Sequence, residues 1–190
     1  MPSTADDLLR AIEAAYGRLP NFFAEVTAHT QMPVVMYMDV DATLADSVLS
    51  PREKQVVLLF LSQYHNSRYD AIVHAHMAQR IGLPPATIDA LLADEPLDDE
   101  RYAALVDATR YSCEQRGWLE PAVLRDLQER GVGKGALYEI FALIGMKTFS
   151  GFTHHLADVA VDGPLQETEA QMNTIPTPPD TVRRRRLFLG

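Results

Sequence analysis

The chain is a succession of short segments in which apolar residues recur every three or four positions. This spacing places the apolar side chains on one face of an α-helix, and no segment shows the two-residue alternation of a strand. The sequence therefore predicts an all-α protein. Proline, glycine and capping residues bound the predicted helices, which cover residues 6–16, 21–30, 33–44, 51–61, 67–81, 86–92, 98–116, 121–130 and 134–155.

The segment 51–61 is the predicted centre of the fold. Ser50 lies three residues before Glu53 with Pro51 between them, which is a capping box with proline at the first helical position. The helix that follows is apolar on every side, so we expect it to be buried. A polar corner ends it, and Ser67 and Asp70 then form a second helix-start signature.

Asp70 and His74 are the strongest chemical candidates in the chain. Residues four apart share one face of a helix, so the carboxylate can hold the imidazole and raise its pKa. This pair would serve as a general acid or base. A structural reading stays open for both residues, because an acid in a first helical turn is a common cap and a half-buried histidine needs a partner.

Composition narrows the class of protein. The formal net charge of -9 argues against a nucleic-acid surface or an anionic membrane as the main partner. The single cysteine, Cys113, excludes an intramolecular disulfide and favours a reducing compartment. The N-terminus is acidic and no apolar run approaches the roughly 20 residues needed to span a bilayer, so we expect a cytoplasmic protein.

The domain organisation follows from the same pattern. A helical domain covers residues 1–165, and residues 166–190 form a proline- and arginine-rich tail without helical period. The tail contains the basic run Arg183 to Arg186, which is a solvated segment or a dock for an acidic partner subunit.

The stretch from Leu49 to Gly82 resembles the carboxymuconolactone decarboxylase and alkylhydroperoxidase superfamily. The Leu-Ser-Pro-Arg-Glu sequence, the long apolar helix, the polar corner and a histidine, His74, eight residues before Gly-Leu-Pro occur in the same order. The resemblance implies an alkylhydroperoxidase-like orthogonal bundle that assembles as a homo-oligomer, a trimer or a hexamer.

The peroxidase branch of this superfamily carries a Cys-x-x-Cys pair, a histidine and a glutamate. The corresponding residues here are Ser67, Asp70, His74 and Gln55. Serine and aspartate cannot form the disulfide of a peroxidase cycle, so thiol peroxidase chemistry is not expected. Tyr69 and Asp70 before His74 are instead similar to the Tyr-acid pair of the decarboxylase-like branch.

We therefore expect a cofactor-independent, carboxymuconolactone decarboxylase-like enzyme, a lyase, acting on a small organic acid or lactone. We expect the substrate to bind in an apolar pocket between the helices 51–61, 67–81 and 134–155. The expected catalytic residues are His74 as the proton carrier, Asp70 as its partner and Tyr69 as a hydrogen-bond donor. The expected substrate-binding residues are Arg68, the nearest cation, with Ser67 and Gln55. No metal site is expected, because His76 faces away from His74, and His154 and His155 would join a cluster only if the fold brought them over. Two alternatives remain: a non-catalytic oligomer used for binding or as a scaffold, and a divergent peroxidase using Cys113.

Overall fold

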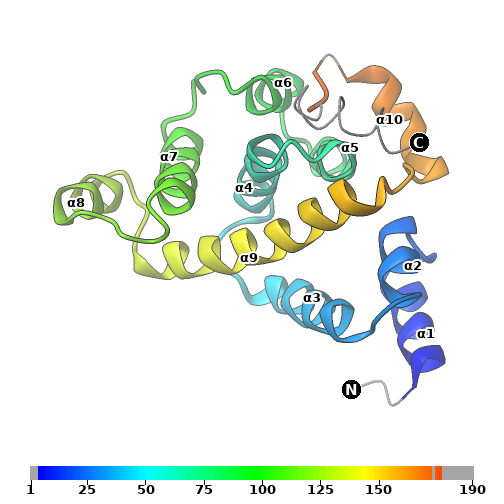
Figure 1. Ribbon diagram of the computed structural model, residues 1–190. Coiled ribbons are helices and arrows are strands. Elements are labelled where there is room, and N and C mark those ends of the chain that lie inside the picture. Colours follow the sequence, from blue (N-terminus) through cyan, green and yellow to red (C-terminus); the bar gives the residue numbers. More distant parts are fainter. Residues whose placement is uncertain (1–3, 173, 177–190) are drawn as a thin grey trace, which may run out of the picture.

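The computed structural model describes residues 4–172 and 174–176, which form helices and contain no strand (Figure 1). The predicted all-α class is therefore confirmed for this part of the chain. The elements are α1 (Ala5–Tyr16), α2 (Asn21–Thr27), α3 (Met32–Thr43), the short 3₁₀ turn η1 (Leu44–Asp46), α4 (Pro51–Tyr64), α5 (Arg68–Arg80), α6 (Pro85–Ala93), α7 (Glu100–Glu114), α8 (Pro121–Glu129), α9 (Lys134–Ala157), the 3₁₀ turn η2 (Gly163–Leu165) and α10 (Gln166–Gln171).

Helix α4 is the centre of the bundle, as its sequence predicts. Its N-terminus is closed by the capping box, in which Ser50 Oγ accepts from the Glu53 amide and the Glu53 carboxylate accepts from the Ser50 amide. Every residue from 55 to 62 is buried. One face of α4 packs on α7 and α9, and the other packs on α5 and α6. Burial on all sides explains why the helix carries no polar face.

Helix α9 crosses the molecule and separates two groups of helices (Figure 1). Helices α4 to α7 lie on one side of it, and α1 to α3 lie on the other. A separate apolar cluster fills the α1–α3 side, where Phe22, Phe23 and Val34 pack with Tyr69 of α5 and Phe149 of α9. The two groups therefore meet along α5 and α9.

The corner between α4 and α5 is tight and brings α9 close. Asn66 adopts a left-handed conformation with φ 54°, and Ser67 caps α5. Gly151 of α9 lies against this corner, where an added methyl group would come within 3.4 Å of His65 Cβ. Helix α9 can thus approach the first turn of α5 closely.

The first six residues of the predicted irregular tail, 166–190, are helical in the structure. Residues 166–171 form α10, which packs on α5, and His76 Nδ1 lies 2.8 Å from Thr168 Oγ1. The run Arg183 to Arg186 lies outside the described residues. No helix of the described part of the chain is long and apolar enough to cross a membrane.

Candidate functional site

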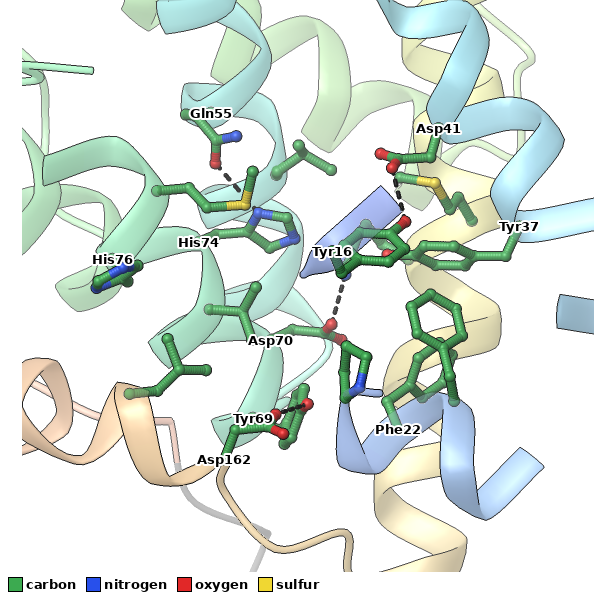
Figure 2. Close-up of a pocket in the computed structure, with 18 of the residues that line it drawn as sticks. Tyr16, Phe22, Tyr37, Asp41, Gln55, Tyr69, Asp70, His74, His76 and Asp162 are labelled. Atoms are coloured by element: carbon green, nitrogen blue, oxygen red, sulfur yellow. Dashed lines mark hydrogen bonds and ion pairs between the residues drawn. The ribbon is translucent and has the colours of Figure 1, made fainter. Parts of the chain in front are cut away.

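A cavity of about 570 Å³ lies where the two groups of helices meet (Figure 2). Its walls come from α1 to α5, α9 and η2, so the N-terminal helices and the C-terminal segment both contribute. The sequence predicts walls from α4, α5 and α9 alone. The apolar part of the lining includes Phe22, Phe23, Tyr37, Leu58, Val73, Met77, Met146 and Leu165.

His74 of α5 lines this cavity and is 5% exposed. Its Nδ1 lies 3.1 Å from Gln55 Oε1 (Figure 2). An amide oxygen only accepts, so with this orientation of Gln55 the imidazole proton sits on Nδ1 and Nε2 carries a lone pair. Nε2 is buried and has no hydrogen-bond partner among the described residues.

The imidazole of His74 is neutral at neutral pH. Burial lowers its pKa to about 3, and the positive charge of Lys147 acts in the same direction against the opposing effect of Asp70. The sequence predicts a raised pKa, and this prediction is wrong. Loss of solvation outweighs the attraction of one carboxylate that is itself neutralised.

Asp70 does not hydrogen-bond to His74, which corrects the predicted pair. Its carboxylate accepts from Lys147 Nζ, from Ser150 Oγ at 3.0 Å and from Ser67 Oγ at 2.8 Å. The spacing of four residues makes contact between two side chains possible, but Asp70 faces α9, and the ammonium group of Lys147 binds it there.

The Asp70–Lys147 pair is an ion pair in the wall of the cavity. Burial opposes the charge on Asp70, yet Lys147, followed by His154 and His74, lowers the pKa of Asp70 to about 2. The Lys147 ammonium group also lies 6.0 Å from the centre of the Tyr37 ring. Lys147 is the buried cation of the site, whereas the sequence favoured Arg68 as the substrate-binding cation.

Arg68 and Ser67 do not line the cavity. The Arg68 guanidinium is half exposed and pairs with Glu169 of α10. Ser67 is buried and caps α5 through Asp70. Of the three predicted substrate-binding residues, Gln55 alone lines the cavity.

Tyr69 lines the cavity, but its hydroxyl is already used. It donates to Asp162, which precedes η2, and burial together with this carboxylate raises the pKa of Tyr69. The ring stacks on His154 with centroids 4.2 Å apart. Tyr69 therefore shapes the wall, and its predicted role as a donor to substrate would require it to leave Asp162.

His154 of α9 also lines the cavity and is 7% exposed. Neither ring nitrogen has a hydrogen-bond partner among the described residues, and Nε2 lies 3.7 Å from Asp70 Oδ1. Burial lowers the pKa of His154 to about 4, despite the opposing effect of Asp70. The sequence indicates His154 only as a possible member of a metal cluster.

The histidines do not converge on a metal site. His76 contacts Thr168, and His155 Nε2 lies 3.2 Å from the Asn66 carbonyl oxygen. Within the described residues, no group of three or more His, Cys, Asp or Glu side chains could hold a metal ion.

Tyr16 and Asp41 form a further polar contact in the lining that sequence reasoning missed. The Tyr16 hydroxyl donates to Asp41 Oδ2 at 2.7 Å, joining α1 to α3 (Figure 2). Burial and this carboxylate raise the pKa of Tyr16, so it remains a phenol at neutral pH.

Cys113 is not part of the site. It lies on α7, half-buried against the cluster that α7 shares with α4 and α9. Burial raises the pKa of its thiol to about 11. Since the thiolate is the reactive species, the proposed single-cysteine peroxidase has no support in this geometry.

No protein-family model and no curated protein matches this sequence. Several solved structures are nevertheless similar in fold. An uncharacterised peroxidase-related protein from Ralstonia eutropha JMP134, described as an alkylhydroperoxidase AhpD core, has a TM-score of 0.74 at 16% identity, with 90% of this chain and 92% of that chain covered. An uncharacterised peroxidase-related protein from Silicibacter sp. TM1040 has a TM-score of 0.67 at 17% identity, covering 84% and 85%.

A third similar structure is the debrominase Bmp8 in complex with 2,3,4-tribromopyrrole. Its TM-score is 0.63 at 16% identity, with 86% of this chain and 88% of that chain covered. Because these sequence identities are low, the similarity to the solved structures shows the fold alone. The chain has the alkylhydroperoxidase-like fold, which confirms the architecture predicted from the stretch Leu49 to Gly82.

Proposed function

We propose that this chain is a cofactor-independent enzyme that moves a proton to or from carbon in a small organic acid or lactone. The cavity is the substrate site and His74 is the general base. The observation that supports this proposal most directly is the buried lone pair on His74 Nε2, which has no protein partner at the cavity wall.

The surroundings of His74 suit a base that is activated by its substrate. The pKa of His74 is about 3 because its ring is buried and Lys147 is a nearby positive charge. A negative charge that develops on substrate during proton removal would stabilise the imidazolium and raise this pKa. Gln55 keeps the proton on Nδ1 and so keeps Nε2 available.

Lys147 is the residue that would stabilise the developing charge. It is held in the wall by Asp70, and Asp70 is its one hydrogen-bond acceptor among the described residues. A fixed ammonium group in a site of low dielectric stabilises an enolate without having to reorganise. Lys147 thus replaces Arg68 in the mechanism that we propose.

A protein of the same fold binds a small ring compound, as the Bmp8 complex with 2,3,4-tribromopyrrole shows for that protein. This supports a small-molecule ligand for the cavity here. The low pKa of His74 also favours a second candidate, a non-catalytic binding module, because a weak base accelerates proton transfer little.

Solvent deuterium exchange separates the two candidates. The protein is incubated in heavy water with a panel of small lactones and keto acids, and loss of carbon-bound hydrogen is followed by NMR. We expect exchange with at least one compound, and a loss of about 10²- to 10⁴-fold in the His74→Gln variant. His29→Gln, at an exposed histidine paired with Glu25, is the control and should exchange at the normal rate.

Full exchange in the His74→Gln variant would remove His74 from the mechanism. Saturable binding of panel compounds without any exchange would favour the binding module instead.

A further inference from the structure

His154 is a buried polar side chain that the proposed mechanism does not use. A neutral imidazole carries one N–H donor and one lone pair, and in His154 neither nitrogen has a hydrogen-bond partner among the described residues, with Asp70 Oδ1 3.7 Å from Nε2. Buried polar groups are nearly always paired, so such a residue in a cavity wall is suited to a ligand.

The ring of His154 is positioned by packing and not by hydrogen bonds. It stacks on Tyr69 at an interplanar angle of 21°, and the Phe22 ring lies 5.1 Å from it on centroids. Tyr69 is held in turn by its bond to Asp162. The plane of the His154 ring is thus fixed before any ligand arrives.

The buried charges around the cavity are paired. Lys147 is neutralised by Asp70, and burial keeps both His74 and His154 in the neutral form. The Asp162 carboxylate accepts from Tyr69 and lies 3.9 Å from Arg18 Nη2. Of the other charged lining residues, Asp41 and Lys54 are partly exposed and Arg80 is exposed. His74 Nε2 presents a lone pair, which repels an anion and accepts a hydrogen bond from an uncharged N–H or O–H group.

We infer that His154 is a second substrate-binding residue and that the two histidines together select an uncharged substrate. Such a substrate donates a proton to His74 and offers a hydrogen-bonding atom to His154. This inference rests on the proposed function and narrows it, favouring the lactone over the ionised organic acid. His154 hydrogen-bonds the substrate, and His74 receives its proton.

Phenol is the probe for this inference, because it is uncharged at neutral pH and carries one hydroxyl group. Benzoate has the same ring with a negative charge, and toluene has the ring without a hydrogen-bonding group. Each compound is titrated into the full chain by calorimetry. We expect phenol to bind about tenfold more tightly than either of the others, the size of a well-placed hydrogen bond.

The variant His154→Phe retains a ring to stack on Tyr69 and removes both nitrogens. We expect it to bind phenol about tenfold more weakly and toluene no more weakly than the unchanged protein does. His155→Phe is the control, since His155 is exposed and does not line the cavity, and it should leave phenol binding unchanged. Thermal unfolding of each variant verifies that it is folded.

Benzoate binding as tightly as phenol would overturn the selection of an uncharged substrate. An unchanged phenol affinity in His154→Phe, or no saturable phenol binding to the unchanged protein, would overturn the role of His154. If phenol binds through His154 while deuterium exchange is absent, the proposed reaction fails and the binding inference stands.

Discussion

Asp70 of α5 and Lys147 of α9 form an ion pair in which the side chains are 5% and 1% exposed. Ser67 and Ser150 donate further hydrogen bonds to the same carboxylate. A buried pair of this kind is compensated only while both partners are present. It therefore links the first turn of α5 to α9 and fixes one wall of the cavity.

Replacing Lys147 by Met should destabilise the protein by about 3–5 kcal/mol, because the buried carboxylate of Asp70 would lose its counter-charge. Urea denaturation measures the free energy of unfolding. The double variant Asp70→Asn with Lys147→Met should recover much of the loss, since no unpaired charge remains. Arg68→Met is the control: its pair with Glu169 is half exposed and contributes only about 0–1 kcal/mol. A loss no greater than that of the control would mean that Asp70 is not ionised in the folded protein.

Stability should fall as the pH drops below 6.5, the ordinary pKa of histidine. The unfolded chain binds protons on His74 and His154 from this pH downward, whereas the folded protein resists protonation until about pH 3 and 4. Across this window each histidine lowers the free energy of unfolding by about 1.4 kcal/mol per pH unit. Asp70 adds to this loss of stability between pH 3.8 and about pH 2. Urea midpoints measured across the acid range check this, and His74→Gln should show a shallower decline.

Changing Gln55 to Glu should move the acid limb of the pH–rate profile upward. A carboxylate accepting from His74 Nδ1 would stabilise the imidazolium and raise the pKa of His74 by about one to three units. Gln55→Leu removes the acceptor without adding charge, so it should lower turnover without such a shift. Deuterium-exchange rates against pH provide the measurement, and identical profiles for Gln55→Glu and the unchanged protein would show that Gln55 does not contact His74 in the working enzyme.

Cys113 should be unreactive at neutral pH. A thiol pKa of about 11 leaves about a hundredfold less thiolate than the ordinary value of 9.0. Iodoacetamide should therefore alkylate the folded protein slowly, and Cys113→Ser should retain full proton-exchange activity. Rapid peroxide consumption that disappears in Cys113→Ser would contradict this prediction and restore the peroxidase hypothesis.

The homo-oligomer stays a prediction, and one face of α9 supports it. Tyr138, Phe152 and Leu156 are 65%, 60% and 89% exposed, and Gly145 between them leaves open space for a crossing helix. We expect a second copy of the chain to cover this face. Light scattering after size exclusion should give a multiple of 21.2 kDa, and Phe152→Glu should reduce it. A monomeric mass for the unchanged protein would refute the expectation.

The sequence predicted the scaffold well because local signals determined it. The capping box at Ser50 and the apolar run after it required a buried helix, and the structure contains one. The position of His74 beside a cavity also followed from the arrangement of α4 and α5. Helical spacing within one segment was sufficient information for these features.

The partner of Asp70 could not be found in the same way, because Lys147 is 77 residues away in the sequence. Spacing along α5 shows which residues share a face but not which charge another helix brings to it. One signal was present: Ile140, Leu143, Lys147, Ser150 and His154 lie at helical spacing on the buried face of α9. A lysine and a histidine on a core-facing stripe indicate a buried polar site.

The cavity lining includes Tyr16 from the first helix and Leu165 from the turn before the last described helix. These two residues are 149 positions apart in the sequence, so during synthesis the wall that η2 supplies is missing until that turn has left the ribosome and docked. The helices around α4 are therefore all synthesised before the cavity has its full lining.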